Sequence, residues 1–255
     1  MSAAPPEPIQ SLVRGLAVIR AFDADHPRLS LADAARRSGL SRATARRVLH
    51  TLVAEGYATT DGRVFGLTPR VLELGFSYLS ALGLPALAQP HLERLSGEVA
   101  ESTSLAVLDG PDIVYVARVA TRRIMSVQIT VGTRFPAYAT SMGRVLLAGL
   151  DEPALAAYVA GTPLLPRTPR AIADEGALRA ELDRVRAQGW ALVDQELERG
   201  LRSVAAPVRD GAGAVVAAVN VSTSTHDDRR LPDDVLDPLL ACTAAIGADL
   251  AVGSP

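Results

Sequence analysis

The residues of this chain best suited to recognise another molecule are arginines gathered on one short stretch. Residues 28–51 hold six arginines and a single acidic residue, Asp33. Guanidinium groups make paired hydrogen bonds to phosphates and to the O6/N7 edge of guanine. At helical spacing such residues are typical of a helix that enters the major groove of DNA. A solvated face on an ordinary helical hairpin is the alternative.

Two short helices joined by a tight turn are predicted to position these arginines. Ser30 is suited to cap the first helix, with Asp33 three residues later, and Gly39 to end it in the left-handed conformation. Ser41 is suited to cap the second helix. At roughly 100° per residue, the second helix has an apolar side and an arginine-bearing side. The apolar side consists of Ala45, Val48, Leu49 and Leu52, and the opposite side of Ala43, Arg46, Arg47 and His50, with Arg42 on the flank.

A further helix over residues 10–22 is expected to pack beneath this pair through its apolar positions. Strands are predicted at residues 57–60 and 63–67, on either side of a tight-hairpin sequence, Asp61-Gly62. Three helices followed by a two-stranded ribbon make a winged helix-turn-helix. Arg63 at the ribbon tip is suited equally to a phosphate or minor-groove contact and to a solvated turn. The predicted DNA-binding residues are Ser41, Arg42, Ala43, Thr44, Arg46, Arg47 and Arg63.

Composition divides the chain into a basic beginning and an acidic remainder. The 255 residues carry a net charge of −2, but residues 1–75 hold ten arginines against seven acidic residues. The other 180 residues hold 16 arginines against 21 acidic residues, which fits DNA contact at one end only. Cys242 is the only cysteine, so neither a disulfide framework nor a thiolate metal cage is expected. We expect no cofactor, no metal, no membrane span and a cytoplasmic location.

The sequence predicts four consecutive parts. Residues 1–8 are rich in proline and expected to be a disordered lead, and residues 9–68 form the winged helix-turn-helix. Residues 69–83 are predicted as a linker helix that is apolar on more than one face, which favours packing between two copies of the chain. Residues 84–255 form the second domain.

Within the second domain, paired hairpins separated by helices indicate an α+β domain with an antiparallel sheet. Helices are predicted at residues 85–101, 141–150, 154–160, 177–188 and 232–250. Strands are predicted at residues 104–108, 113–119, 124–131, 203–208 and 214–221.

From residue 11 to about residue 250, the sequence resembles the IclR family of bacterial transcriptional regulators. The resemblance is carried by the helix-turn-helix and by three further segments, Leu12–Ile19, Gly132–Arg144 and Asp194–Glu196 with Gly200–Ser203. The sequence of residues 132–144 is most similar to that of the family branch that controls aromatic-acid and β-ketoadipate pathway genes. Each segment alone would be a weak signal, and together they are specific.

The resemblance implies an α-rich winged helix-turn-helix followed by an α+β, GAF-like domain that binds a small organic acid. It also implies homodimers, often paired into homotetramers, on palindromic operators, with repression or activation as the outcome. The effector is expected to be an aromatic or dicarboxylic acid.

The expected effector site combines residue chemistry with the resemblance. Ser141, Met142 and Gly143 begin a predicted helix, whose free N–H groups and dipole attract anions. Arg134 is suited to clamp a carboxylate, and Phe135 and Tyr138 to wall an aromatic ring. The resemblance adds five polar residues, of which the two acids could instead hold Arg202: Asp194, Glu196, Ser203, Asn220 and Ser222.

Two other functions were weighed against this one. A hydrolase is disfavoured because the sequence has no Gly-x-Ser-x-Gly motif, no histidines at metal-ligand spacing and no phosphate-binding glycine loop. The protein is therefore not expected to be an enzyme. A winged-helix regulator whose second domain serves only protein–protein assembly stays open.

Overall fold

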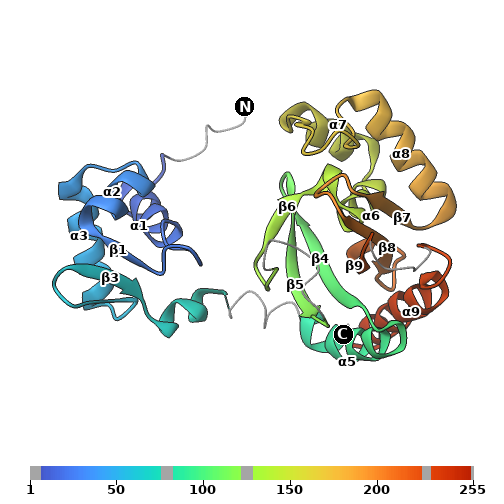
Figure 1. Ribbon diagram of the computed structural model, residues 1–255, viewed down its shortest axis with the longest axis horizontal. Helices are drawn as coiled ribbons and strands as arrows, with labels where there is room; N and C mark the ends of the chain where they lie inside the picture. Colours follow the sequence, from blue (N-terminus) through green and yellow to red (C-terminus); the bar gives the residue numbers. More distant parts are fainter. Residues whose placement is uncertain (1–6, 76–82, 122–128, 226–230, 254–255) are drawn as a thin grey trace. The chain divides into compact units, whose positions relative to one another are not determined.

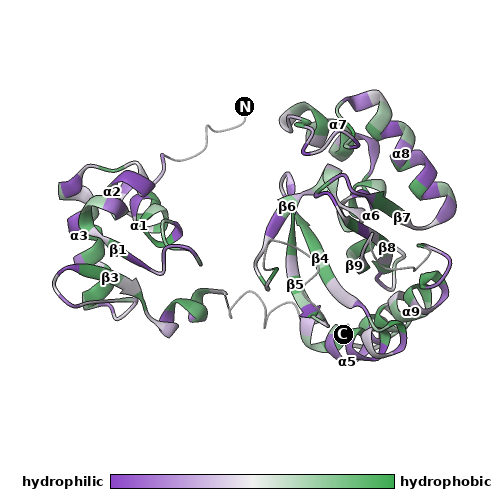
Figure 2. Ribbon diagram, in the orientation of Figure 1, coloured by the Kyte–Doolittle hydropathy of each residue, from purple (hydrophilic) through white to green (hydrophobic). Residues whose placement is uncertain are grey.

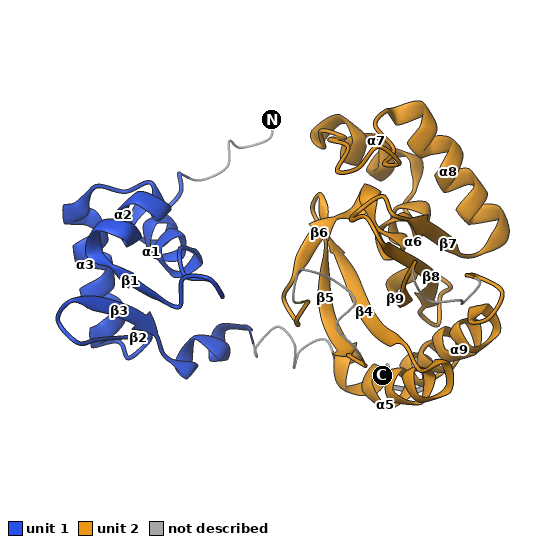
Figure 3. Cartoon of the chain, viewed as in Figure 1, with its two compact units in different colours: residues 1–81 blue, residues 82–255 orange. Residues whose placement is uncertain are grey.

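The computed structural model divides the chain into two compact units, residues 1–81 and 82–255 (Figure 3). It describes residues 7–75, 83–121, 129–225 and 231–253. Most of the predicted lead, the second half of the predicted linker helix and residues 124–128 of a predicted strand lie outside the described residues. The two units are described one at a time.

The first unit is a winged helix-turn-helix, as the sequence predicts (Figure 1). Its helices are α1 (Gln10–Arg20), α2 (Leu31–Ser38) and α3 (Arg42–Ala54). The wing strands are β2 (Ala58–Thr60) and β3 (Val64–Leu67). A third strand, β1 (Arg28–Ser30), was not predicted, and it pairs antiparallel with the free edge of β3.

The predicted caps and turn hold the helix pair. The Ser30 hydroxyl accepts from the Asp33 N–H at 3.2 Å and donates to the Asp33 carboxylate at 2.7 Å. Gly39 ends α2 at φ 68°, in the left-handed region where glycine carries no steric cost. The Ser41 hydroxyl accepts from the Thr44 N–H at 3.2 Å and caps α3. These local bonds satisfy helix-end donors and fix where α3 begins.

Helix α1 packs less completely than the sequence pattern indicates. Val18 is fully buried, but Leu12, Val13 and Leu16 are 60%, 48% and 39% exposed. The expected packing of this helix against α2 and α3 is confirmed, although not every apolar position takes part in it. One face of α1 fills the core of the unit, and the apolar residues on its other side contact solvent.

The start of the predicted linker helix lies within the described residues. A 3₁₀ turn, η1 (Pro69–Val71), leads into helical residues 72–75. Leu72 and Leu74 are 74% and 53% exposed, so this segment presents apolar side chains to solvent. Residues 76–82 of the predicted helix lie outside the described residues.

The second unit is built on a six-stranded antiparallel sheet with strand order β6-β5-β4-β9-β8-β7 (Figure 1). Its strands are β4 (Ser102–Asp109), β5 (Asp112–Val119), β6 (Arg134–Pro136), β7 (Ala191–Asp194), β8 (Leu201–Arg209) and β9 (Val215–Ser224). The α+β class with an antiparallel sheet is thus confirmed.

Helices cover both faces of this sheet. Helices α5 (Leu84–Val99) and α9 (Leu236–Gly253) pack together on one face, where the Thr103 hydroxyl donates to the Leu92 carbonyl of α5. Helix α6 (Ser141–Ala148) lies on the other face, backed by α8 (Glu175–Gln188), with α7 (Glu152–Gly161) nearby. Figure 2 shows that β4 and β5 are largely hydrophobic, whereas α8 alternates hydrophilic and hydrophobic residues.

Only residues 129–131 of the strand predicted at residues 124–131 lie within the described residues. Residues 129–131 are not in a strand, and β6 begins at Arg134. The β-branched residues before Gly132 resemble a strand, but Gly132 adopts φ 89° and the Thr133 N–H donates to the Thr130 carbonyl at 3.0 Å. This turn interrupts the extended backbone, although the Gly132 N–H donates to the Tyr115 carbonyl of β5 at 2.8 Å, and the paired residues of β6 follow it. Strand β7, four residues long, was not predicted.

Among the described residues, no helix is both long enough and apolar enough to cross a membrane. A search of the same residues for clusters of three or more histidine, cysteine, aspartate or glutamate side chains that could hold a metal ion found none.

Candidate functional site

Helix α3 has the two faces that the sequence predicts. Ala45 and Leu49 are fully buried against the core of the first unit. Arg42, Arg46 and Arg47 are exposed on the other side. None of these three arginines forms an ion pair with any residue that the structure describes, so their charges are available to a partner. The remaining predicted contacts, Ser41, Ala43 and Thr44, lie at the start of the same helix.

The wing places Arg63 in its turn. The Asp61 carboxylate accepts from the Arg63 and Val64 N–H groups, both at 2.9 Å, and pairs with Arg28 at 2.9 Å. These hydrogen bonds hold the pKa of the Asp61 carboxyl below its usual value. The turn is therefore fixed by its own aspartate, and the exposed Arg63 side chain is left to contact solvent or a partner.

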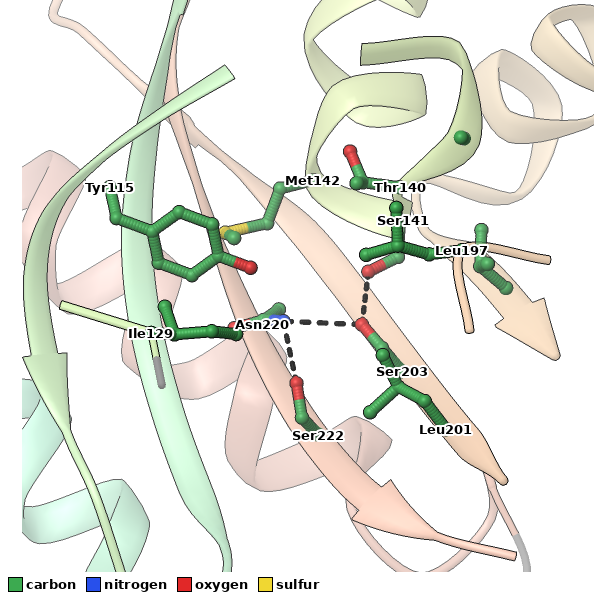
Figure 4. Close-up of a pocket in the computed structure, with 12 residues that line it drawn as sticks. Tyr115, Ile129, Thr140, Ser141, Met142, Leu197, Leu201, Ser203, Asn220 and Ser222 are labelled. Atoms are coloured by element: carbon green, nitrogen blue, oxygen red, sulfur yellow. Dashed lines mark hydrogen bonds between the residues drawn. The ribbon is translucent and has the colours of Figure 1, made fainter. Parts of the chain in front are cut away.

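The second unit contains a small pocket between its sheet and the amino end of α6 (Figure 4). Its free volume is about 20 Å³, which is room for roughly one water molecule. The pocket is lined by residues of the sheet, of the turn before α6 and of the segment between β7 and β8: Tyr115, Ile129, Ala139, Thr140, Ser141, Met142, Val193, Leu197, Leu201, Ser203, Asn220 and Ser222.

Asn220 is the centre of the polar side of this pocket. Its amide donates to the Ser203 hydroxyl at 3.1 Å and to the Ser222 hydroxyl at 2.9 Å, and the Ser203 hydroxyl also contacts that of Ser141. The Asn220 side chain is 3% exposed, and its Oδ1 atom is buried without a hydrogen-bond partner. A buried carbonyl oxygen that accepts nothing is costly in free energy. The pocket therefore has a vacant acceptor, and figure 4 shows the amide among the lining side chains.

The amino terminus of α6 supplies donors to the same pocket. The Thr140 hydroxyl accepts from the Gly143 N–H at 3.0 Å and caps the helix. The N–H groups of Ser141 and Met142 belong to the first turn, which has no acceptor within the helix. Together with the helix dipole, these N–H groups favour a negative charge at this end.

Tyr115 forms the aromatic side of the pocket. Its ring packs edge-to-face against Phe135, with 6.0 Å between the ring centroids. Burial raises the pKa of the Tyr115 phenol to about 12, so the hydroxyl stays neutral and keeps its proton at physiological pH. Figure 4 shows this hydroxyl directed toward Asn220 and Met142 across the pocket.

The structure brings together only part of the predicted effector site. Ser141, Met142, Ser203, Asn220 and Ser222 all line the pocket. The alternation of Asn220 and Ser222 along β9, which predicted a shared face, is confirmed by their common hydrogen-bond network.

Arg134 and Tyr138 do not line the pocket. The Arg134 guanidinium is half-exposed on β6, where it pairs with Asp109 at 2.6 Å and with Asp112 at 3.2 Å. Tyr138 is 3% exposed, and its hydroxyl donates to the Leu165 carbonyl at 2.7 Å. The expected carboxylate clamp and ring wall are therefore corrected: one side chain is held by acids at the sheet edge, and the other is packed in the core.

Phe135 and Gly143 act on the pocket indirectly. Phe135 contacts the ring of Tyr115 and does not line the cavity itself. A Cβ atom at Gly143 would lie 2.0 Å from the Ala137 carbonyl oxygen, so only glycine lets the turn before α6 approach the helix this closely. Gly143 thereby sets where Thr140 and Ser141 lie.

The two predicted acids hold arginines. Asp194 pairs with Arg170 at 2.8 Å and lies 3.7 Å from Arg202, which agrees with the structural role weighed for it. Glu196 pairs with Arg144, a residue only 1% exposed, and accepts from the Ile172 N–H at 3.1 Å. The Arg144–Glu196 pair connects α6 to the segment between β7 and β8, and both segments line the pocket.

Several lining residues escaped the sequence argument, namely Tyr115, Ile129, Ala139, Val193, Leu197 and Leu201. Because Tyr115 lies in a predicted strand, the alternation of side chains indicates which neighbours share its face of the sheet. It does not indicate which face carries a pocket. The others are ordinary apolar residues, and no local signal distinguishes them from core.

The fold and these surfaces define a winged helix-turn-helix DNA-binding regulator with a separate α+β domain. Residues 11–62 match the family described as the IclR helix-turn-helix domain, and residues 76–248 match that described as the bacterial transcriptional regulator IclR C-terminal. The chain therefore belongs to the IclR family of transcriptional regulators, which agrees with the expectation of a regulator rather than an enzyme.

Curated relatives include regulators of aromatic catabolism. The chain is 50% identical to the Pca regulon regulatory protein of Pseudomonas putida over 246 residues, covering 96% of this chain and 84% of that protein. It is 39% identical to the p-hydroxybenzoate hydroxylase transcriptional activator of Acinetobacter baylyi, covering 92% and 89%. These relatives agree with the branch that the sequence resembles.

Solved structures share the whole fold. A transcriptional regulator from Rhodococcus sp. RHA1 matches with a TM-score of 0.86 at 54% identity, covering 97% of this chain and all of that one. An IclR homologue from Microbacterium hydrocarbonoxydans, in complex with 4-hydroxybenzoate, matches with a TM-score of 0.84 at 27% identity, covering 95% and 100%.

Proposed function

We propose that this regulator binds operator DNA through α3 and the wing, and that a small aromatic acid in the pocket of the second unit controls that binding. The observation that carries the proposal is the vacant Asn220 Oδ1, buried beside the amino terminus of α6. An acid with a hydroxyl group complements both features, because the hydroxyl can donate to Oδ1 and the positive end of the helix dipole stabilises the negative charge of an acid in the pocket.

The small volume of the pocket sets a condition on this proposal. A cavity of about 20 Å³ does not admit a benzoate ring, so lining side chains must separate when the acid binds. Leu197 lies in the irregular segment between β7 and β8, which includes Gln195 at φ 60°. This segment has no sheet or helix bonds to break at Leu197, so it is the part of the lining that can move at least cost.

Relatives support the aromatic class of the ligand. The Microbacterium homologue contains 4-hydroxybenzoate, and the Acinetobacter relative is named as an activator for p-hydroxybenzoate hydroxylase. With Tyr115 and its partner Phe135 on one side, the pocket here offers an aromatic surface for a ring of the same kind.

We infer that DNA binding uses a homodimer, or a pair of homodimers, on a palindromic operator. Apolar side chains on the first unit support this inference, because Leu12 and Leu16 on α1 and Leu72 after the wing are exposed. Single exposed leucines are ordinary, but several on one small unit favour a protein contact. Half-sites about 34 Å apart would then match two recognition helices on one face of the duplex.

Effector binding is proposed to change how the second domains of the dimer pair, and the linker helix to transmit that change to the spacing of the recognition helices. The acid can change operator affinity only as far as it binds one arrangement of the two units more tightly than another. The linker, residues 69–83, is the covalent path between them.

Calorimetry with 4-hydroxybenzoate and protocatechuate tests the ligand half of the proposal. We expect wild-type protein to bind at least one of them. Asn220→Leu, which keeps the branching of the side chain at Cγ but replaces the amide with methyl groups, should weaken binding about 10-fold or more, because hydroxyl donors in the pocket lose their partner. Gln89→Leu on α5 makes the same exchange away from the pocket and should change nothing.

Two results would contradict this part of the proposal. If neither acid nor β-ketoadipate binds wild-type protein, the second domain serves assembly alone. If Asn220→Leu binds as tightly as wild type, the pocket is elsewhere.

A further inference from the structure

A second polar group lies on the pocket face of the sheet, beyond the residues that line the cavity. Ser104 of β4 stands directly opposite Asn220 of β9 on one side and Arg118 of β5 on the other. Residues directly opposite each other on antiparallel strands point to the same face of a sheet. Arg118 therefore shares the face of Asn220, two strands away, with Ser104 between them.

The contacts of Arg118 leave its charge largely unmatched. Its Nη1 donates to the Ser104 hydroxyl at 2.9 Å, and its Nε is buried without a hydrogen-bond partner. Among the residues that the structure describes, it forms no ion pair. Burial lowers the pKa of this guanidinium, because the charged form has lost water without gaining an anion.

Other arginines of the same unit differ in this respect. Arg144 is more deeply buried but pairs with Glu196, and Arg134 and Arg170 pair with aspartates at the surface. A cation taken partly out of water is stabilised only by a counter-charge or by hydrogen bonds to all its donors. Among the described residues, Arg118 has one such hydrogen bond, to Ser104, and no acidic partner.

Tyr115 connects Arg118 to the cavity. Tyr115 lines the pocket and stands opposite Ala106 on the same face of the sheet, a few residues along β5 from Arg118. The charge of Arg118 opposes the effect of burial on the pKa of the Tyr115 phenol, so the guanidinium lies within electrostatic reach of that ring. An anion that enters beside Tyr115 therefore comes under the influence of Arg118.

We propose that Arg118 is the residue that recognises the carboxylate of the effector and so selects acids over neutral analogues. The inference rests on the proposed function of the same pocket. The carboxylate clamp that the sequence placed at Arg134 is thus assigned to Arg118, which lies on the same face of the sheet as Asn220. The Nε and Nη2 atoms of the guanidinium can donate to a carboxylate while Nη1 donates to the Ser104 hydroxyl.

The test compares an acid with its neutral isostere. We would measure the affinities of 4-hydroxybenzoate and 4-hydroxybenzamide for wild type, Arg118→Met and Arg118→Lys by calorimetry on the full-length protein. Arg118→Met should lose about 10-fold or more in affinity for the acid and less than about 2-fold for the amide. Arg118→Lys should recover part of the acid preference, because it keeps the charge but not the planar fork.

Arg134→Met is the matched control, since it removes an arginine of the next strand that is already paired with acids. It should leave the ratio of acid to amide affinity unchanged. A role of Arg118 in stability alone would weaken both ligands equally, so an unchanged ratio in Arg118→Met would overturn the proposal, as would a fall in the ratio for Arg134→Met alone. If Arg118→Met fails to fold, Arg118→Lys decides: its acid preference must fall while amide affinity holds. Wild-type protein that binds neither ligand would instead overturn the proposed function itself.

Discussion

At the scale of single residues, the arginines of this protein differ in whether they form an ion pair with an acidic side chain. Arg28, Arg36 and Arg37 of the first unit are paired with aspartates, whereas Arg42, Arg46 and Arg47 form no ion pair with a described residue. Paired arginines fasten the fold, and exposed unpaired ones on a helix anchored by its other face can reach DNA.

Arg46→Ala and Arg47→Ala should each weaken operator binding by about 1–3 kcal/mol if the residue reads a base, and relax one base pair of the operator. Neither change should lower the unfolding temperature, because both side chains are exposed. Fluorescence anisotropy with operator duplexes carrying single base changes measures both the operator affinity and the base preference of each variant. Arg179→Ala on α8 is the control, and undiminished affinity in both test variants would contradict the assigned face.

Residue-level prediction from sequence succeeded where periodicity fixed the direction of a side chain. Asn220 and Ser222 were placed on one face because strands alternate, and the arginines of α3 because helices repeat. It failed for Arg134 and Tyr138, whose side chains do not line the pocket. A short edge strand and a 3₁₀ turn (η2, Ala137–Ala139) direct these two side chains elsewhere, and no local pattern encodes that.

At the scale of elements, the approach of η2 to α6 decides the shape of the pocket. Gly143 is the contact point, since an added Cβ would collide with the backbone of Ala137. Gly143→Ala should therefore destabilise the second unit by about 3 kcal/mol, and calorimetric unfolding should show a lower transition temperature. Gly97→Ala, in an open position of α5, should be neutral or slightly stabilising. Equal unfolding temperatures for the two variants would show that the close approach is not required.

Element boundaries were predicted well where caps or turn residues mark them. Ser30, Gly39 and Ser41 placed α2 and α3, and the hairpin of β4 and β5 followed from its turn. Strands β1 and β7 were missed because each is short and neither is joined to its partner by a tight turn, the signal that predicted the equally short β2 and β3. Strand β1 pairs with β3, which follows α2 and α3 in the chain, and β7 pairs with β8 across the irregular residues 195–200.

At the scale of the whole molecule, this chain is a member of the IclR family, with a helix-turn-helix unit and a second unit that we propose binds the ligand. The sequence could reveal both functions because each uses a local pattern, a capped basic helix and a helix end beside alternating polar residues. The lining of the pocket also includes residues of β5 and of the segment before β8. Only the folded sheet brings these residues together with the ones that the sequence predicted.

The most direct test of the account is operator affinity measured with and without the acid. An operator would be selected from random duplexes by the full-length protein, and its binding followed by anisotropy during titration with 4-hydroxybenzoate and protocatechuate. We predict specific binding that changes at least several-fold with one acid, and a response that Asn220→Leu abolishes while its binding of DNA without ligand stays intact. Selection of no sequence, or an operator affinity that no acid changes, would contradict the account.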